Sequence, residues 1–380
     1  MRVLFDHQAF SIQDFGGVSR CFSEVYKHLP DDVDAQLGLL ESNNKYVQGW
    51  DGINPKGYFY NHFICKKDFW GKGHLFLWID RFRNLKYCPD CNKNFCIELL
   101  KQGEFDIFHP TYFDDYFLPY LKGKPFVLTI HDMIPERFEG LDEWQKEKKA
   151  YLSKRAAHII TVSHHSKKDI INLLGIPEER ITVVYHGAPE DYFVMKDPMF
   201  GFPYIAYPGS RGFYKNFSLM LRYLRGFLKR HKGVYLVCTG PDFSETEKQL
   251  ISELDLKESI IHCFIEEKDL GSFYHHAVCL VYPSAYEGFG LPILEAFKAE
   301  CPVLLNNASC FPEIAGDAAV YFRISDKSSN LEEMLETIWN YSPQTRKELI
   351  ERQNKRLCLF SWTKSAIQMA EVYRKVIRSK

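Results

Sequence analysis

No run of apolar residues in this 380-residue sequence approaches the roughly 20 residues that a membrane-spanning helix needs. The opening stretch MRVLFDHQAF carries Asp6 and His7, where a secretory signal peptide would be apolar. The net charge is −1, so the chain lacks the basic surplus with which nucleic-acid-binding proteins neutralise phosphates. No internal repeat or low-complexity tract is evident. We therefore expect a cytoplasmic protein with no nucleic-acid partner.

The cysteines do not have the regular spacing of a disulfide framework. Several of the eleven lie in apolar stretches such as VYLVCTG and IIHCFI, which is typical of reduced, buried thiols. Cys88, Cys91 and Cys96 form one cluster, CPDCNKNFC, and a C-x-x-C pair can supply half of a zinc site. No second pair follows at a suitable spacing. The alternative is a turn at the start of the helix NFCIELLKQG, and we expect neither a metal nor a cofactor.

Short β-rich runs alternate with helical patterns along both halves of the chain. In the first half, strands are predicted at 2–5, 35–40, 105–109, 125–132, 157–163 and 181–187. In the second half they are predicted at 204–210, 234–240, 259–265, 277–284 and 302–307. Strands separated by helices predict an α/β fold with two doubly wound, parallel-sheet (Rossmann-like) domains. A content of 46% hydrophobic residues is enough to bury more than one core.

The domain boundary is predicted from a change in composition. Residues 187–203, GAPEDYFVMKDPMFGFP, combine glycine and proline with no clear period and are the expected linker. The expected domains are 1–190 and 200–360, with the C-terminal helix 361–380 packing back on the first. Ligands of doubly wound sheets bind at the carboxyl ends of the strands, so we expect a site in a cleft between the domains.

The stretch YEGFGLPILEAF, residues 286–297, has two carboxylates around a glycine-rich turn. A strand precedes it, and Pro292 falls in the first turn of the following helix, where a missing N–H costs nothing. A strand–loop–helix junction directs unpaired N–H groups at the loop and favours an anion such as phosphate. Gly288 and Gly290 let a ligand approach the backbone. Glu287 and Glu295 suit ligand hydroxyls, so a sugar nucleotide fits both features; the alternative is a pair of solvated helix-terminal acids.

Three other strand ends carry polar signals. Gly16 and Gly17 precede a helix and form either an anion site or a plain tight turn. His131 follows the strand FVLTI on the ligand side of the sheet, and is either functional or structural. Arg211 and Lys215, in YPGSRGFYKNF, are either cations for a diphosphate or ordinary surface charge.

In chain order, GGVSR, HPTYF, TIHDMIPE, AHIITVS, YPG followed by YKN, CTGP, YEGFGLPILEAF and PEIAGDAA resemble the retaining nucleotide-sugar glycosyltransferases of family 4. Those enzymes have the two-domain GT-B fold. The resemblance runs from residue 1 to the closing FSWTKSAIQMAEVYRKV, whereas residues 41–100 match no motif of the family.

The resemblance implies a role for each site residue. Glu295 corresponds to the ribose-binding Glu, and Glu287 to the Glu that reaches the sugar ring. The turn amides of Phe289, Gly290 and Leu291 contact sugar and phosphate. Lys215 matches the diphosphate-binding Lys, and His131 the His beside the transferred sugar. The family's partner Arg falls one position earlier, at Ser210, so Arg211 departs from the pattern.

Sugar transfer builds negative charge on the departing diphosphate, so donors must be placed where that charge develops. Lys215, the Gly16–Gly17 amides and the turn after Glu287 would supply them. Many sugar transferases use a metal held by Asp-x-Asp instead. The triplet Asp32-Val33-Asp34 lies between the first helix and the second strand and is interpreted as a solvated turn. We expect metal-independent transfer, with retention implied by the family.

The partners follow from the resemblance: a nucleotide-sugar donor, GDP- or UDP-linked, and a glycan or lipid-linked glycan acceptor in polysaccharide biosynthesis. Mannose is the first candidate, because HDMIPE and YKN are similar to bacterial polysaccharide mannosyltransferases. The alternatives are a GT-B epimerase or phosphorolytic enzyme and a non-catalytic sugar-nucleotide-binding subunit. Loss of His131, Glu287 or Lys215 would mark the last, and all three are present.

Residues 66–87, KKDFWGKGHLFLWIDRFRNLKY, mix cations with large aromatics. Such a composition suits weak peripheral contact with an anionic membrane, here its inner face. The alternative is a helix packed on the core by Phe76, Leu77, Ile79 and Phe82 with its cations solvated. The cations are Lys66, Lys67, Lys72, Arg81, Arg83 and Lys86, and the other aromatics are Phe69, Trp70 and Trp78.

Overall fold

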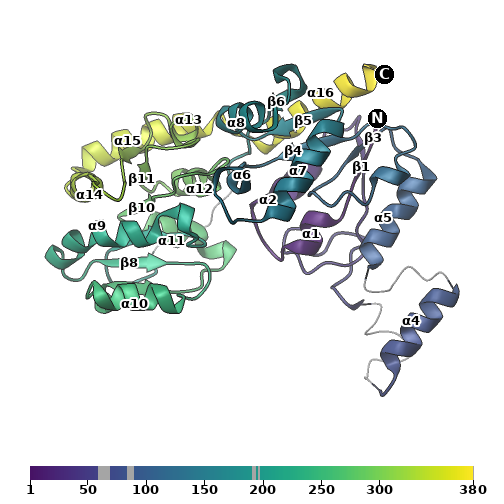
Figure 1. Cartoon of the computed structure of the whole chain (residues 1–380). Helices are drawn as coiled ribbons and strands as arrows, with labels where there is room; N and C mark the ends of the chain where they lie inside the picture. Colours follow the sequence, from purple (N-terminus) through teal and green to yellow (C-terminus); the bar gives the residue numbers. More distant parts are fainter. Residues whose placement is uncertain (59–68, 84–89, 191–193, 196, 380) are drawn as a thin grey trace. The chain divides into compact units, whose positions relative to one another are not determined.

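The computed structural model describes residues 1–58, 69–83, 90–190, 194–195 and 197–379, with the backbone alone for 80–83. The chain divides into two compact units (Figure 1). The first unit comprises Met1–Val162, Lys167–Val184 and Trp362–Lys380. The second unit comprises Ser163–Ser166 and Tyr185–Ser361.

The described strands of the first unit pair in parallel. They form two three-stranded sheets, ordered β2-β1-β3 and β4-β5-β6, and a parallel bridge between Phe108 and Phe126 joins the second to the first. In register, Leu4 on β1 lies between Gln36 and Phe108. The strands are β1 (Arg2–Phe5), β2 (Asp34–Leu37), β3 (Ile107–His109), β4 (Val127–Ile130), β5 (His158–Thr161) and β6 (Ile181–Val183).

Helices connect these strands, as parallel pairing requires. The α-helices are α1 (Gln8–Ile12), α2 (Gly17–Lys27), α4 (Lys72–Arg83), α5 (Cys91–Gln102), α6 (Ile134–Arg137), α7 (Glu143–Arg155) and α16 (Trp362–Arg378). Helix α8 (His164–Leu174) begins in the segment that clusters with the second unit. Among its described residues the first unit also has two short 3₁₀ helices, η1 (Leu118–Tyr120) and η2 (Glu178–Arg180).

The second unit has one six-stranded parallel sheet in the order β12-β11-β10-β7-β8-β9. Because the chain runs outward in both directions from β7 and β10, these two neighbours mark the topological switch point, where doubly wound sheets bind ligands. The strands are β7 (Tyr204–Tyr207), β8 (Tyr235–Cys238), β9 (Ile260–His262), β10 (Cys279–Tyr282), β11 (Val303–Asn306) and β12 (Val320–Phe322).

Helices also cover this sheet, and their apolar faces meet the buried strands in one core. The α-helices are α9 (Phe217–Arg230), α10 (Glu245–Glu253), α11 (Leu270–His275), α12 (Leu291–Lys298), α13 (Phe311–Ala315), α14 (Leu331–Trp339) and α15 (Pro343–Leu357). The 3₁₀ helices are η3 (Phe213–Lys215), η4 (Lys257–Ser259) and η5 (Glu267–Asp269).

The predicted fold class is confirmed, and each strand predicted from the sequence exists. Strand β1 has the predicted bounds, β2 begins one residue earlier and ends earlier than predicted, and the other predicted strands are shorter. Strands β7, β10 and β11 are buried along their whole length, which explains their near-continuous apolar runs. The sequence prediction missed β12. This three-residue edge strand is only partly buried and does not have the long apolar run of its neighbours.

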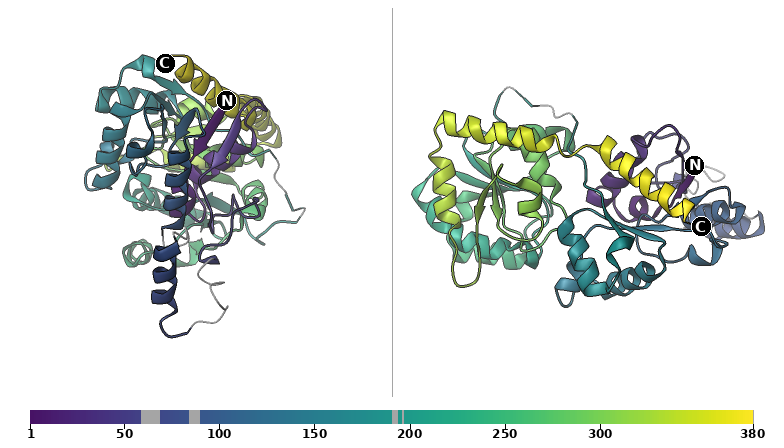
Figure 2. Two further views of the ribbon diagram at one scale, coloured as in Figure 1. Left: turned by 90° about the vertical axis from the view of Figure 1, so that its right-hand side faces the viewer. Right: turned by 90° about the horizontal axis from the view of Figure 1, so that it is seen from above.

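The C-terminal helix α16 packs against α2 and β5 of the first unit (Figure 2). Tyr373 is fully buried, and its hydroxyl lies 2.7 Å from Nδ1 of His109 at the end of β3. Arg374 donates from Nη2 to both carboxylate oxygens of Asp32, at 2.7 Å each. The first acid of the Asp-x-Asp triplet therefore binds a side chain of the C-terminal helix.

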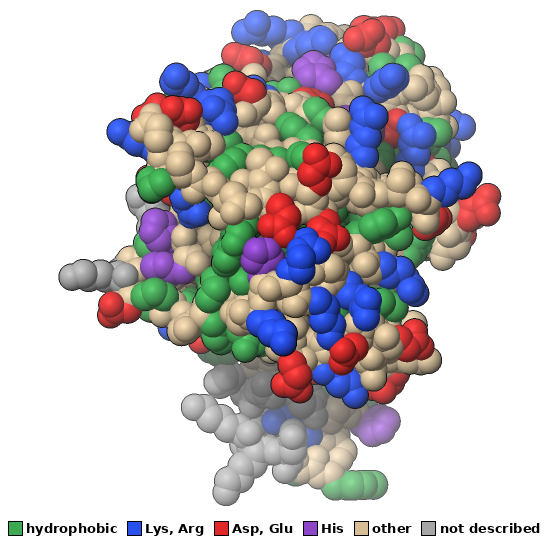
Figure 3. Space-filling model, turned by 90° about the vertical axis from the view of Figure 1, so that its left-hand side faces the viewer, with side chains coloured by type: hydrophobic (Ala, Val, Ile, Leu, Met, Phe, Trp, Pro, Cys, Tyr) green, Lys and Arg blue, Asp and Glu red, His purple; other side chains and the backbone are tan. Residues whose placement is uncertain are grey.

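On the face shown in Figure 3, acidic and basic side chains are interspersed rather than gathered into a field of one sign. This distribution agrees with the net charge of −1. Within the described part of the chain, no helix combines the length and the hydropathy that crossing a bilayer requires.

Candidate functional site

The switch point of the second unit brings two of the predicted residues together. Lys215 ends η3 in the loop after β7, and Glu287 lies in the loop after β10, the neighbouring strand. Their side chains form an ion pair, with Lys215 Nζ 3.1 Å from Glu287 Oε1. Each side chain is 13% exposed, so the pair is shielded and still reachable from solvent.

Hydrogen bonds within its own loop and from the loop after β11 fix Glu287. The Ser284 hydroxyl donates to Glu287 Oε1 at 2.9 Å. The Ser309 hydroxyl accepts from the Glu287 amide at 3.1 Å and donates to its carbonyl at 2.6 Å. The carboxylate is therefore oriented before any ligand binds, which lowers the entropy cost of binding. The sequence prediction did not include these two serines.

The turn after Glu287 depends on one glycine in particular. Gly290 has φ +91° and is the N-cap of α12, and a Cβ there would lie 3.2 Å from the Phe311 ring. The Gly288 carbonyl accepts a hydrogen bond from the Ser163 hydroxyl at 2.7 Å. Phe289 is buried, with its ring 4.8 Å from that of His186. The turn is thus held by Ser163 at Gly288 and by His186 at Phe289.

Glu295 lies on α12, whose first turn contains Pro292 as predicted. Its side chain is buried, and Glu295 Oε2 accepts a hydrogen bond from the Tyr274 hydroxyl at 3.1 Å. A carboxylate is rarely buried without a polar partner. The interpretation of Glu295 as a solvated helix-terminal acid is therefore wrong.

Arg211 is bound by the protein itself. Its guanidinium lies 3.0 Å from Glu247 Oε1 and donates to the Thr239 carbonyl at 3.0 Å and to those of Pro241 and Asp242. The side chain is 3% exposed, so it ties the loop after β7 to the loop after β8 rather than carrying surface charge. Contact of Arg211 with a donor stays a prediction.

The first unit carries the remaining predicted residues. Gly16 has an extended backbone and is the N-cap of α2, and Gly17 is the first residue of that helix. Both therefore lie at a helix start, as predicted from the sequence. His131 follows β4, with its ring 5.9 Å from that of Phe22. Burial lowers the pKa of His131 to about 4, so its imidazole is neutral at pH 7. A neutral imidazole can donate one hydrogen bond and accept another.

A buried lysine secures the loop that carries His131. Lys149 on α7 donates to the Asp132 carbonyl at 3.0 Å and to Glu136 Oε2 at 3.0 Å. The two side chains are 1% and 5% exposed. The sequence prediction missed this pair, because Lys149 is one of four lysines in EWQKEKKAYLSKR, a helix without apolar periodicity.

The cysteine cluster does not assemble within the described residues. Cys91 is the first residue of α5 and Cys96 lies inside the same helix; both are buried, and burial raises the pKa of the Cys96 thiol. Cys88 lies outside the described residues, as do 66–68 and 84–87 of the aromatic segment and 191–193 and 196 of the linker.

Two family models match separate parts of the chain. The model described as Glycosyltransferase Family 4 matches residues 73–192. The model described as Glycosyl transferases group 1 matches residues 200–356, which contain the Lys215–Glu287 pair.

Two similar bacterial proteins are both named as O-antigen chain mannosyltransferases. The O-antigen chain mannosyltransferase RfbU of Salmonella typhimurium is 27% identical over 245 residues, 59% of this chain and 65% of that protein. The O-antigen chain mannosyltransferase B of Escherichia coli is 28% identical over 283 residues, 68% of this chain and 72% of that protein. The first match thus spans just under two thirds of the relative's length.

Among solved structures, HepE of Anabaena in complex with UDP and glucose is similar to this chain with a TM-score of 0.69. The identity is 18%, and the match covers 99% of this chain and 100% of HepE. At that identity the likeness concerns the fold. Both halves of the chain therefore match models of glycosyltransferase domains, and the chain has the GT-B fold.

Proposed function

We propose that the protein transfers a hexose from a nucleoside-diphosphate sugar to a glycan or lipid-linked glycan acceptor, with retention of anomeric configuration and without a metal. Mannose from GDP-mannose is the first candidate, and a UDP-linked sugar is the second. The observation that carries this proposal is the Lys215–Glu287 ion pair at the switch point of the second sheet.

In the proposed reaction Lys215 stabilises the departing diphosphate. Its ammonium leaves Glu287 for the phosphate oxygens as the donor binds, and the negative charge that builds there is met by a cation already in place. Exchange of partners is feasible because the pair is only partly buried, so neither charge is stranded in an apolar core.

The carboxylates serve the hydroxyl groups of the donor. Glu287, oriented by Ser284 and Ser309, accepts from hydroxyls of the transferred sugar. Glu295, one helix turn beyond Gly290, accepts from the ribose hydroxyls. The amides of Phe289, Gly290 and Leu291 at the start of α12 face the same ligand, with the helix dipole favouring its phosphates.

The acceptor side of the proposal assigns Gly16, Gly17 and His131 to the reacting groups. The neutral imidazole of His131 suits a hydrogen-bonding role beside the sugar better than that of a permanent cation. In retaining transfer the acceptor hydroxyl enters on the face that the diphosphate leaves, so no nucleophilic carboxylate is required.

The similarity to O-antigen chain mannosyltransferases supports mannose as the first sugar to test. The complexes of HepE with UDP and glucose and with UDP-glucose support a UDP-linked donor as the second. Both candidates share the diphosphate and ribose on which the proposed contacts depend.

Release of nucleoside diphosphate from GDP-mannose and UDP-glucose by the purified full chain, with and without EDTA, tests the proposal. We expect release of nucleoside diphosphate from one of the two donors in the presence of EDTA. When the donor is α-linked and an acceptor is added, NMR should show an α-linked product. The Lys215→Met variant should be slower by about a hundredfold, as for loss of a leaving-group contact. The exposed control Lys232→Met should match the wild type.

Three outcomes would contradict the proposal. Donor binding without release would favour a non-catalytic binding subunit, conversion of the donor to its epimer would favour an epimerase, and loss of activity in EDTA would exclude metal-independent transfer.

A further inference from the structure

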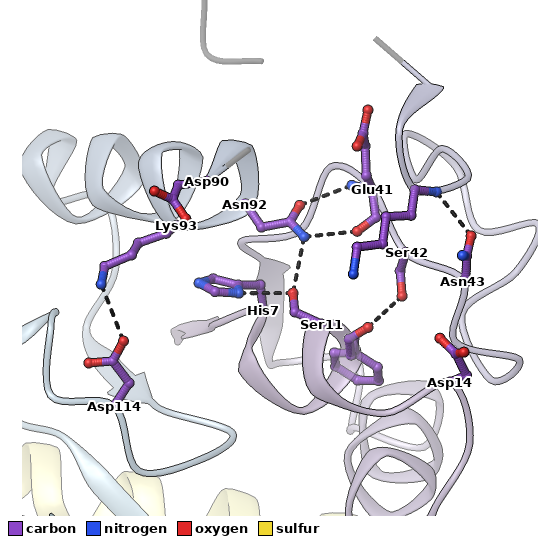
Figure 4. Close-up of a pocket in the computed structure, with 12 residues that line it drawn as sticks. His7, Ser11, Asp14, Glu41, Ser42, Asn43, Asp90, Asn92, Lys93 and Asp114 are labelled. Carbon is purple, nitrogen blue, oxygen red and sulfur yellow. Dashed lines mark hydrogen bonds and ion pairs between the residues drawn. The ribbon is translucent and has the colours of Figure 1, made fainter. Parts of the chain in front are cut away.

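The first unit contains a cavity of about 280 Å³ that the proposed donor site does not use (Figure 4). Its walls come from the loop and helix after β1, residues 41–43, Lys56, the start of α5 and Asp114. The volume is near the lower end of ligand pockets, about 300 Å³. The cavity therefore suits one sugar unit better than an extended ligand.

His7 presents an unsatisfied nitrogen in this cavity. Its Nδ1 lies 3.0 Å from the Ser11 hydroxyl, and its ring lies 5.6 Å from that of Tyr116. Its Nε2 is shielded from solvent and has no hydrogen-bond partner among the described residues. A buried polar atom without a partner costs free energy, which a ligand hydroxyl at this position would recover.

Asn92 holds the wall around His7 rigid. Its Oδ1 accepts from the amides of Leu40 and Glu41, at 2.8 and 3.0 Å. Its Nδ2 donates to the Glu41 carbonyl at 2.8 Å and to the Ser11 hydroxyl at 3.1 Å. Asn92 thus joins its own helix α5 to two segments far apart in the sequence, residues 40–41 and Ser11, and fixes the wall beside His7.

This network is compatible with the His7 tautomer that carries its proton on Nε2. The two backbone amides fix the orientation of the Asn92 amide, so Nδ2 is the donor to Ser11. The Ser11 hydroxyl can then donate its own proton to His7 Nδ1. That arrangement places the imidazole proton on Nε2, which becomes a donor to an oxygen in the cavity.

The charges lining the cavity disfavour an anionic ligand. Four carboxylates face two lysines, and Lys93 is paired with Asp114 at 3.2 Å. A phosphate or a uronic acid would add a negative charge to this surplus. Neutral hydroxyl groups can instead donate to the carboxylates and accept from His7. The carboxylates are Asp14, Glu41, Asp90 and Asp114, and the second lysine is Lys56.

We propose that this cavity binds one neutral sugar unit, with a sugar hydroxyl hydrogen-bonded to His7 Nε2, and that it thereby selects uncharged acceptor glycans. Its assignment to the acceptor rests on the proposed function. The binding of a neutral sugar does not.

Ligand-observed NMR titration of the full chain with methyl α-mannopyranoside, in the absence of any nucleotide sugar, tests this site. We expect saturable binding that His7→Phe weakens about fivefold, the effect of one net hydrogen bond. The control His28→Phe, which does not line the cavity, should bind as the wild type does. Glucuronate should bind more weakly than the neutral sugar.

A second variant tests the site independently, in case His7→Phe does not fold. Asp14 is exposed, and Asp14→Asn removes one negative charge from the cavity, so it should narrow the preference for the neutral sugar over glucuronate. Equal affinity in wild type and a folded His7→Phe, no binding by wild type, or tighter binding of glucuronate would each overturn the site. Because no donor is present, failure of this test leaves the transferase proposal standing, and failure of transfer leaves this site standing.

Discussion

The two units each place a lysine–glutamate pair beside the carboxyl end of a parallel strand, and the two pairs differ in exposure. Lys215 and Glu287 of the second unit are each 13% exposed and lie 3.1 Å apart. Lys149 and Glu136 of the first unit are 1% and 5% exposed and lie 3.0 Å apart. The distances are nearly equal, so burial is the variable that separates them.

The difference in burial indicates that the two ion pairs have different functions. A partly exposed pair can exchange one partner for a ligand, because solvent screens the charge that is released. A fully buried pair cannot, because removal of one partner strands the other charge in a low dielectric. We therefore assign Lys215–Glu287 to the donor and Lys149–Glu136 to the support of the loop that carries His131.

The largest expected effect is on stability in the first unit. Lys149→Met should lower the free energy of unfolding by about 3–5 kcal/mol, because it leaves the Glu136 carboxylate buried without its cation. Urea unfolding followed by circular dichroism measures this.

The neighbouring Lys148→Met is the matched control. Its partner is Asp115 at 2.8 Å in a more exposed pair, so a loss of about 1 kcal/mol or less is expected. Lys215→Met should also stay within about 1–2 kcal/mol while its activity falls, and equal losses at Lys149 and Lys215 would remove the distinction between the pairs.

Donor affinity should show the next largest effect. Glu295→Ala should weaken nucleotide binding by about 1–3 kcal/mol, because the ribose hydroxyls lose their acceptor. Isothermal titration with GDP and UDP measures this change. Glu287→Ala should affect turnover more than nucleotide affinity, since its proposed partner is the transferred sugar. Unchanged GDP and UDP affinity in a folded Glu295→Ala protein would contradict the role of Glu295.

The burial of His131 predicts a dependence of stability on pH. Its pKa is about 4 in the folded chain and 6.5 when exposed, so the unfolded state binds the proton more readily between these values. Stability should fall as the pH is lowered from 6.5 towards 4. His131→Gln should reduce this slope by up to about 1.4 kcal/mol per pH unit. An unchanged slope in urea unfolding at pH 5, 6 and 7 would show that His131 titrates normally.

The smallest effect concerns the segment 66–87. Trp70, Leu77 and Trp78 are exposed, as a membrane-facing segment requires, whereas Lys72 is buried and cannot face lipid. Weak binding to phosphatidylserine vesicles remains a prediction. Co-sedimentation should decrease with salt and with Lys66→Glu, and protein that stays in the supernatant at low salt would leave only the helix-packing interpretation.

The two units also differ in how far their sites could be predicted from the sequence. In the second unit the site lies on strand–loop–helix segments that are continuous in sequence, so glycines and carboxylates at fixed spacing reveal it. The supporting Ser163 and Ser309 come from other loops and leave no local pattern.

In the first unit the chemistry depends on contacts between distant residues. The cavity joins His7, Glu41, Asn92 and Asp114, and two of these, Glu41 and Asn92, lie in the region 41–100 that has no recognisable motif. Lys149 looks like one more surface cation in a charged helix until the fold buries it. Periodicity predicts which faces are apolar, but it does not show which charge the fold encloses.

A crystal structure of the full chain with a non-hydrolysable GDP-mannose or UDP-glucose analogue would test the proposed donor-site assignments most directly. We expect the diphosphate on Lys215 Nζ and the amides that begin α12, the sugar against Glu287, and the ribose hydroxyls on Glu295. A nucleotide bound elsewhere, or bound there with Lys215 still paired only with Glu287, would contradict them.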